Sequence, residues 1–113
     1  MKRITRKLSD QELAELERHF GSFEFHNAFD LVYEDQIPNT GVIVLAGEAV
    51  LTRKKRIFDR IERGTLYGIY ELLNNEPVRH GCKVRDNAKV ILLKKTDLKD
   101  LSNEDSLLSK ILS

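Results

Sequence analysis

The chain contains little of what many small proteins use to hold a fold or a catalytic site. Cys82 is its only cysteine, so an intrachain disulfide and a cluster of thiolate ligands for zinc are both excluded. Tryptophan is absent, and no apolar run approaches the roughly 18 residues that a membrane-spanning helix needs. Positive and negative side chains nearly balance, 19 against 18, which leaves no overall attraction to nucleic acid or anionic lipid. The composition therefore predicts a cytoplasmic protein with no membrane span.

The length of the chain bounds its organisation. A chain of 113 residues is enough for one domain that buries roughly two thirds of its unfolded surface. No internal repeat and no low-complexity linker divides it. We therefore expect a single domain over residues 1–113, with an N-terminal helix within 8–21, a β-roll over 23–95 and a C-terminal helical segment over 96–113.

The N-terminal helix has clear start and stop signals. Ser9 is followed three residues later by Glu12, which is the spacing of a capping box. Leucines follow at helical spacing, and Gly21 comes just after the last of the apolar positions. These signals predict a short amphipathic helix over 9–20.

Short apolar runs separated by turn signals make up the middle of the chain. The run 42–46 is followed by Gly47, after which a β pattern resumes at 49–51. A glycine at such a place is expected where a strand bends sharply and changes its partner. Further strands are indicated over 57–61, 81–84 and 89–93.

A run of four basic residues separates two of these predicted strands and is typical of the tip of a β-hairpin. Such a tip could face acidic lipid, nucleic acid or an acidic partner, or it could be a solvated edge that discourages strand aggregation. Carboxylates at Asp59 and Glu62 lie nearby in the sequence and favour the solvated edge. The basic tip consists of Arg53, Lys54, Lys55 and Arg56.

The order of these elements predicts the fold class. A helix is followed by many short strands with turns at close intervals, and then by a second helical region. This order indicates a mainly β fold with flanking α-helices, in which two sheets form a small roll of the double-stranded β-helix or jelly-roll type. No helical crossover separates the strands, which argues against an open parallel sheet.

Three stretches occur in an order that is similar to one known family. They are residues 32–35 before a turn, 42–51 with Gly47 between two strands, and 61–64 leading into Tyr67 and Gly68. From Leu31 to about Leu101 the chain thus resembles the cyclic-nucleotide-binding domain. This β-roll is shared by the catabolite activator protein, the regulatory subunits of protein kinase A and cyclic-nucleotide-gated channels.

The segment 67–79 keeps the spacing of the family's phosphate-binding cassette. The resemblance implies a glycine that lets backbone approach the sugar phosphate, a helical turn with free N–H groups, a glutamate for the ribose hydroxyl and an arginine for the phosphate. Here the glutamate position holds Ile69, and the position after Pro77 holds Val78. The candidate ligand-binding residues are Gly68, Ile69, Tyr70, Glu71, Arg79 and His80.

These departures change the expected ligand. Glu71 could replace the missing acceptor only if the register slid by two residues, which would put Tyr70 where the glycine is needed. A ribose hydroxyl facing Ile69 would lose a hydrogen bond worth about 0.5–1.5 kcal/mol, and the charge-assisted pair to arginine is also lost. We therefore expect weak or no binding of cyclic AMP and cyclic GMP. Another anionic, nucleotide-like ligand near Arg79 and His80 stays open, and no other cofactor is expected.

No group of side chains predicts catalysis or metal binding. No nucleophile, base and acid are arranged as a set, and His19, His26 and His80 share no metal-ligand spacing. Cys82, in an apolar strand, is expected to be a small core residue. The sequence therefore predicts a protein that is not an enzyme.

The C-terminal segment is more apolar than a short docked helix needs. The surplus of apolar residues suggests that the segment forms a lid over the cassette or a self-complementary surface of a homodimer. Two hypotheses remain: a regulatory module with a structural, degenerate cassette that acts through protein–protein interaction, or a sensor of a cyclic nucleotide or another small anion. The sequence contains no helix-turn-helix after the roll, so direct DNA binding is not expected. The candidate association residues are Leu101, Leu107, Leu108, Ile111 and Leu112.

Overall fold

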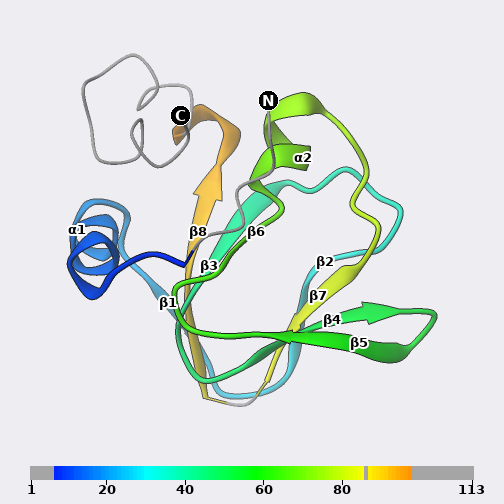
Figure 1. Cartoon of the computed structure of the whole chain (residues 1–113), viewed down its shortest axis with the longest axis horizontal. Helices are drawn as coiled ribbons and strands as arrows, with labels where there is room; N and C mark the ends of the chain where they lie inside the picture. Colours follow the sequence, from blue (N-terminus) through cyan, green and yellow to red (C-terminus); the bar gives the residue numbers. More distant parts are fainter. Residues whose placement is uncertain (1–6, 86, 98–113) are drawn as a thin grey trace.

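The computed structural model describes residues 7–85 and 87–97, which form two antiparallel four-stranded sheets with two helices (Figure 1). This arrangement confirms the predicted mainly β double-sheet roll. Sheet A has the order β1-β8-β3-β6, with β1 (Phe23–Phe25), β8 (Ala88–Lys94), β3 (Thr40–Ala46) and β6 (Leu66–Tyr67). Sheet B has the order β2-β7-β4-β5, with β2 (Phe29–Val32), β7 (Gly81–Val84), β4 (Ala49–Arg53) and β5 (Arg56–Ile61).

Helix α1 (Asp10–Phe20) begins at the predicted capping box. The Ser9 hydroxyl accepts from the backbone N–H of Glu12 at 3.2 Å, and the Ser9 N–H donates to Oε1 of Glu12 at 2.9 Å. The helix ends at Gly21, which has a φ of 77° and whose N–H donates to the Glu17 carbonyl at 2.7 Å. These local signals therefore fix both ends of the helix.

The chain passes from sheet A to sheet B at Gly47, as the sequence predicts. Gly47 has a φ of 75°, and a Cβ there would lie 2.8 Å from the Cα of Ala88. Both the left-handed backbone and the close approach of β8 therefore require glycine at this corner. Residues before it pair in sheet A, and residues after it pair in sheet B.

Sheet A carries an apolar layer on each face. Val42 and Val44 of β3 face sheet B, while Ile43 and Leu45 alternate with them and face the helices. The inter-sheet layer comprises Val32, Val42, Val44, Ala49, Ile61, Val78, Cys82, Val84, Ala88 and Val90. The outer layer packs α1 and α2 (Ile69–Asn74) on the other face and comprises Leu8, Leu13, Leu16, Ile43, Leu45, Leu66, Ile69, Leu72, Ile91 and Leu93.

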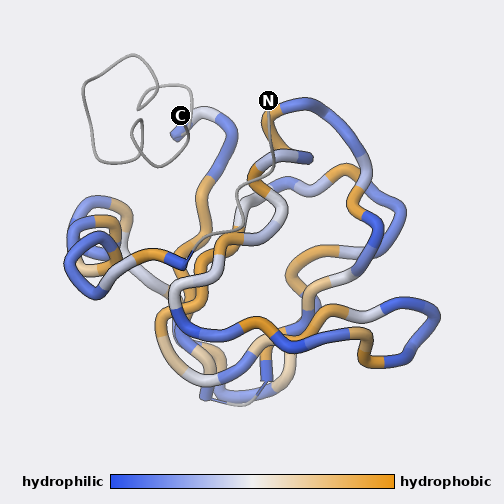
Figure 2. Tube along the Cα trace, viewed as in Figure 1, coloured by the Kyte–Doolittle hydropathy of each residue, from blue (hydrophilic) through white to orange (hydrophobic). Residues whose placement is uncertain are grey.

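The β4–β5 hairpin projects from the body of the domain, and its second strand is largely exposed (Figure 1). Of the six residues of β5, only Ile61 is buried. In Figure 2 the end of the hairpin is blue, with an orange apolar stretch at the start of β5. Within the described residues, no helix has both the length and the apolar character to cross a membrane. The predicted association residues of the C-terminal segment lie outside the described part of the chain.

Candidate functional site

The cassette segment begins where β6 ends and α2 starts. Gly68 is the N-cap of α2 and has a φ of 80° in the left-handed region. A Cβ at this position would make only ordinary contacts, the nearest being 3.6 Å from the Thr40 carbonyl oxygen. The glycine is therefore needed for its backbone conformation rather than for space.

Ile69 occupies the position at which the resemblance places a glutamate. Its side chain is 3 % exposed and belongs to the outer layer between α2 and sheet A. Gly41 of β3 makes room for it, because a Cβ on Gly41 would lie 2.6 Å from Cγ1 of Ile69. The position thus serves the packing of the helix on the sheet.

Val78 occupies the position at which the resemblance places an arginine. Its side chain is fully buried in the inter-sheet layer. Its backbone is held on both sides, since its N–H donates to the Gln36 carbonyl at 3.0 Å and its carbonyl accepts from the Asp35 N–H at 2.7 Å. Ile69 and Val78 therefore lie in different apolar layers, on opposite faces of sheet A.

Tyr67 links the cassette segment to sheet B. It lies on β6 of sheet A and packs against the inter-sheet layer, and its hydroxyl donates to the His80 carbonyl oxygen at 2.6 Å. His80 directly precedes β7 of sheet B. The tyrosine therefore spans the space between the two sheets. The sequence identifies Tyr67 only as an aromatic of the motif, and no local signal predicts this contact.

Arg79 and His80 face the β4–β5 hairpin. The Arg79 side chain is exposed, and its carbonyl accepts from Nη1 of Arg53 at 2.5 Å. The His80 ring stacks on Phe58, with ring centroids 4.2 Å apart and an interplanar angle of 27°. Burial, with the neighbouring positive charges of Arg79 and Arg53, lowers the pKa of His80, while Glu34 opposes this effect.

The remaining candidates, Tyr70 and Glu71, are part of the short helix. The Tyr70 carbonyl accepts from Nδ2 of Asn74 at 2.8 Å. Glu71 is buried, and its carbonyl accepts from the N–H groups of Asn75 and Glu76, which end the helix. The structure thus brings residues 68–71 together on α2, and separately brings Arg79 and His80 to the hairpin.

The predicted hairpin tip is present at the expected residues. Arg53 pairs with Arg56 across a two-residue turn formed by Lys54 and Lys55. Nη1 of Arg53 lies 3.6 Å from Oε2 of Glu34 and 3.3 Å from Oδ1 of Asp35. The N–H of Lys54 donates to Oε1 of Glu34 at 2.8 Å. These contacts hold the hairpin against the loop that follows β2.

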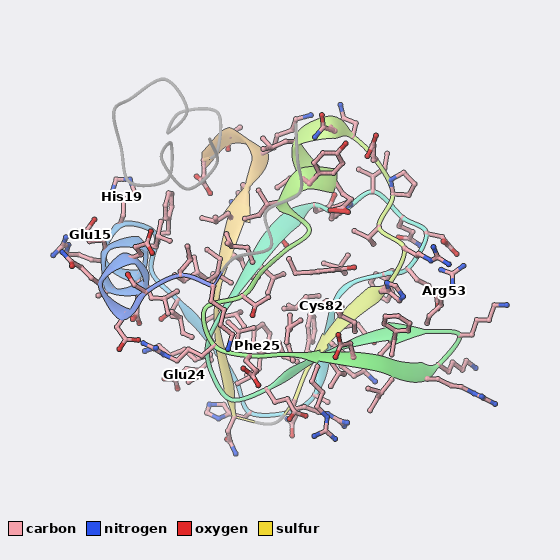
Figure 3. All side chains as sticks on the ribbon, in the orientation of Figure 1. Glu15, His19, Glu24, Phe25, Arg53 and Cys82 are labelled. Carbon is pink, nitrogen blue, oxygen red and sulfur yellow. The ribbon has the colours of Figure 1, made fainter. Side chains whose placement is uncertain are left out.

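Cys82 lies between the two sheets (Figure 3). Burial, and to a smaller extent the negative charge of Asp30, raises the pKa of its thiol to about 12. The thiol therefore stays protonated and is a poor nucleophile. Among the described residues, no group of three or more histidine, cysteine and acidic side chains converges to hold a metal ion.

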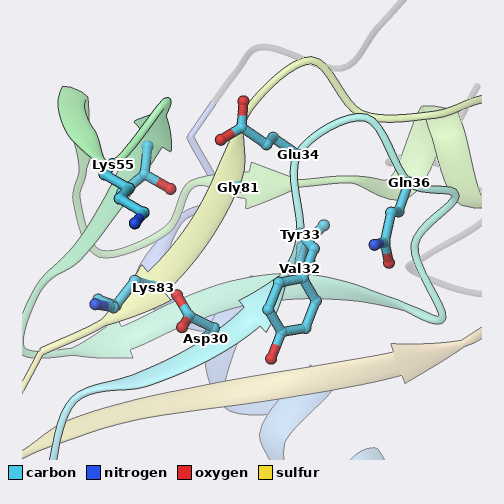
Figure 4. Close-up of a pocket in the computed structure, with 9 residues that line it drawn as sticks. Asp30, Val32, Tyr33, Glu34, Gln36, Lys55, Gly81 and Lys83 are labelled. Atoms are coloured by element: carbon cyan, nitrogen blue, oxygen red, sulfur yellow. The ribbon is translucent and has the colours of Figure 1, made fainter.

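A groove of about 640 Å³ lies on the outer face of sheet B (Figure 4). Gly81 is at a close approach within it, because a Cβ there would lie 2.8 Å from Oγ1 of Thr52 and 3.1 Å from the Val32 carbonyl oxygen. The groove mixes charges of both signs, and sequence reasoning did not identify it because three distant strands form it. Its lining residues are Asp30, Val32, Tyr33, Glu34, Gln36, Thr52, Lys55, Gly81 and Lys83.

Two antiparallel sheets closed into a roll, with a short helix between β6 and β7 and a preceding helix on sheet A, define the cyclic-nucleotide-binding β-roll fold. Solved structures agree with this class. No protein-family model and no curated protein sequence matches the chain.

Three solved structures illustrate the similarity of fold. One, from work on a cyclic-GMP-dependent signalling pathway that regulates bacterial phytopathogenesis, has a TM-score of 0.77 at 19% identity, over 94% of this chain and 89% of that one. The Thermus thermophilus catabolite activator protein has a TM-score of 0.68 at 20% identity, over 93% and 52%. A cyclic nucleotide-binding domain from Methylobacillus flagellatus has a TM-score of 0.69 at 16% identity, over 93% and 62%. The chain thus spans about half of the catabolite activator protein, and at these identities the likeness is one of fold.

Proposed function

We propose that this chain is a non-catalytic regulatory module whose cassette segment has become part of the protein core. The observation that carries the proposal is the separation of Ile69 and Val78 into two apolar layers on opposite faces of sheet A. A ligand that needs an acceptor at the first position and a cation at the second cannot be bound by two buried aliphatic side chains. The module then acts through a protein partner rather than through cyclic AMP or cyclic GMP.

The energetics favour loss of the usual ligand. A ribose hydroxyl that meets no acceptor, and a phosphate that meets no arginine, each forfeit a hydrogen bond, and charge-assisted bonds are the stronger kind. Arg79 does not take the arginine position of the cassette, because it follows Val78 by one residue and its exposed side chain lies beside the hairpin, where Arg53 holds its backbone carbonyl. The Tyr67 hydroxyl, bonded to the His80 carbonyl, also takes up space between the sheets near this segment.

The alternative is a sensor of a cyclic nucleotide or another small anion. It is supported by Gly68, which keeps the left-handed backbone that a cassette glycine provides. Arg79 and His80 would supply the cation and a titratable donor for such a ligand. Of the similar structures, two are described as bound to cyclic AMP, and the fold is therefore compatible with this alternative.

Calorimetric titration with cyclic AMP, cyclic GMP and cyclic dinucleotides distinguishes the two functions. We expect no saturable heat up to about 500 µM ligand, a limit that corresponds to a binding free energy weaker than about −4.5 kcal/mol. A dissociation constant below a micromolar for any of these ligands would contradict the proposal. In that case Arg79→Ala should weaken binding, whereas Arg18→Ala, which removes an exposed cation on α1, should not.

A second measurement addresses the partner. We propose that the leucine-rich C-terminal segment contributes an association surface, and the simplest partner is a second copy of the chain. Light scattering after size exclusion should report a dimer, and replacing Leu108 and Ile111 with glutamate should yield monomers that keep their β circular dichroism. A chain that stays monomeric at high micromolar concentration would exclude self-association.

A further inference from the structure

The end of the β4–β5 hairpin combines positive charge with exposed apolar surface. We define the hairpin tip as residues 53–58. Its last two residues, Ile57 and Phe58, are 50 % and 67 % exposed, and Phe58 is the most exposed large apolar side chain among the described residues. A shallow hollow of about 660 Å³ lies on the tip and is lined by Arg53, Lys54, Arg56, Ile57 and Phe58. Cations and apolar side chains therefore share one surface.

The positive charge of the tip is largely uncompensated. Arg53 is committed to Glu34, Asp35 and the Arg79 carbonyl. Within residues 7–85 and 87–97, the side chains of Lys54, Lys55, Arg56 and Arg79 form no ion pair. The local surface is therefore basic although the whole chain has a net charge of only +1.

The turn residues also conflict with the local backbone. Lys54 and Lys55 both lie in the left-handed region, with φ of 51° and 67°. Asparagine, aspartate and glycine adopt this conformation more readily. The other described non-glycine residues with positive φ are Asp35, Asn75 and Asn87, so the chain uses the favourable residue types elsewhere. The fold does not explain lysine at both turn positions, which indicates that the positive charge serves a function.

The tip is held in a defined orientation. The Arg53 contacts fix the base of the turn against the loop after β2, and the stack of Phe58 on His80 fixes the start of β5. The hairpin nevertheless projects from the body of the domain (Figure 1). It therefore presents its apolar side chains on a convex end rather than in a closed groove.

We propose that the hairpin tip binds the surface of an anionic lipid bilayer. Ile57 and Phe58 enter the boundary between headgroups and acyl chains, while Lys54, Lys55, Arg56 and Arg79 contact lipid phosphates. Clustered basic residues are attracted to the negative surface potential of a membrane, and adjacent apolar side chains add interfacial burial. This inference goes beyond the proposed regulatory function and does not depend on the state of the cassette.

Other acidic partners fit the tip less well. Single-stranded nucleic acid could stack on the face of Phe58 that His80 leaves free, but Ile57 would then have no role. An added peptide strand would need a regular edge on β5, and the β4–β5 register shifts between Leu51 and Thr52. A bilayer makes no such demand on strand geometry and accounts for both apolar side chains.

Vesicle sedimentation with the full chain tests the proposal. The protein should bind phosphatidylcholine vesicles that contain about one third phosphatidylserine, and should bind neutral vesicles of pure phosphatidylcholine at least about tenfold more weakly. Raising the salt concentration should weaken binding, because the charges are exposed and screened. No binding to anionic vesicles, or equal binding to neutral ones, would overturn the proposal.

Matched variants locate the contact. The single variant Ile57→Ser and the double variant Lys54→Ser with Lys55→Ser should each weaken binding to anionic vesicles about tenfold or more, because apolar burial and charge both contribute. Ile37→Ser, at a side chain that is 52 % exposed and lies outside residues 53–58, should have no effect, and neither should the double variant Arg18→Ser with Lys94→Ser. Unchanged thermal midpoints would show that the variants fold. Equal losses in the controls, or no loss in Ile57→Ser, would reject insertion of the tip.

Because the chain has no tryptophan, a single introduced tryptophan can report whether the tip enters the bilayer. Ile57→Trp introduces the only tryptophan of the chain. Its emission should shift to the blue on addition of anionic vesicles, whereas Ile37→Trp should not shift, because tryptophan at the tip alone would enter the interface. A single-stranded oligonucleotide serves as the competitor. If it displaces the protein from vesicles, and if it changes the Ile57→Trp emission at a lower concentration than lipid does, the surface binds nucleic acid instead of a bilayer.

Discussion

The cassette segment and the hairpin tip are both conspicuous in the sequence, but they differ in how well their residues suit the local structure. In the cassette segment, Ile69 and Val78 are almost completely buried and each agrees with its apolar surroundings. In the hairpin tip, Lys54 and Lys55 occupy backbone conformations that disfavour them, and Phe58 is largely exposed. The first region can be explained by packing alone, and the second cannot.

This difference bears on how a motif is interpreted. Gly68 connects β6 to α2 in a left-handed conformation, and α2 packs on sheet A through Ile69 and Leu72. These roles are structural and persist without a ligand. Residues that conflict with their local structure are the better guide to function, since a sequence tends to agree with its fold wherever function does not intervene.

The largest expected effect is a loss of stability on placing a charge in the cassette segment. Ile69→Glu should lower the free energy of unfolding by about 3–5 kcal/mol, because a carboxylate would enter the apolar outer layer without a partner. The urea midpoint measures it. Ile69→Val, the control, should cost only about 0.5–1.5 kcal/mol. An Ile69→Glu variant that keeps its midpoint and gains affinity for a cyclic nucleotide would show that position 69 faces a ligand site.

The next effect concerns the backbone of the same segment. Gly68→Val should cost more than about 1 kcal/mol, since a β-branched residue is strained at a φ of 80°. Gly68→Asn should cost less, as asparagine tolerates the left-handed region. Because the nearest contact of a Cβ at Gly68 is 3.6 Å, crowding should add little. Equal urea midpoints for the valine and asparagine variants would show that φ does not determine the residue here.

A smaller effect tests the connection between the sheets. Tyr67→Phe should lower the free energy of unfolding by about 1 kcal/mol, because the His80 carbonyl loses the donor that the Tyr67 hydroxyl provides. Tyr33→Phe, at an exposed ring, is the matched control and should leave the thermal midpoint unchanged. If the two variants melt alike, the contact between Tyr67 and His80 does not stabilise the roll.

Local signals in the sequence were sufficient to predict much of the fold. The capping box at Ser9, the corner at Gly47 and the hairpin tip over residues 53–56 each depend on a few neighbouring residues, and the structure has all three. Similarity of motif order to a known family supplied the closure of the strands into a roll.

The arrangement of the candidate site could not be predicted in the same way. The face of sheet A on which Ile69 lies depends on how α2 packs against β3, and the stack of Phe58 on His80 depends on the pairing of β4 with both β5 and β7. These contacts join residues more than twenty positions apart. Sequence spacing carries no information about them until the register of the strands is known.

The smallest expected effect lies at His80, which joins the two compared regions. Its carbonyl accepts from Tyr67 and its ring stacks on Phe58. Burial foremost, with Arg79 and Arg53, lowers its pKa from the ordinary value of 6.5. The unfolded chain therefore takes up a proton at His80 more readily than the folded chain does. The stabilisation from neutral His80 is fully present above pH 6.5 and is lost as the pH falls through that value toward the lower pKa of the folded state.

The variant His80→Phe keeps an aromatic ring against Phe58 but removes the titration. Urea unfolding of the wild type and the variant, repeated from about pH 7.5 to about pH 5, should show that the wild type loses more of its free energy of unfolding on acidification. The difference between the two proteins should grow only below the ordinary pKa of histidine. Parallel pH profiles would mean that the pKa of His80 is the same in the folded and unfolded states, and that burial and the neighbouring charges do not lower it.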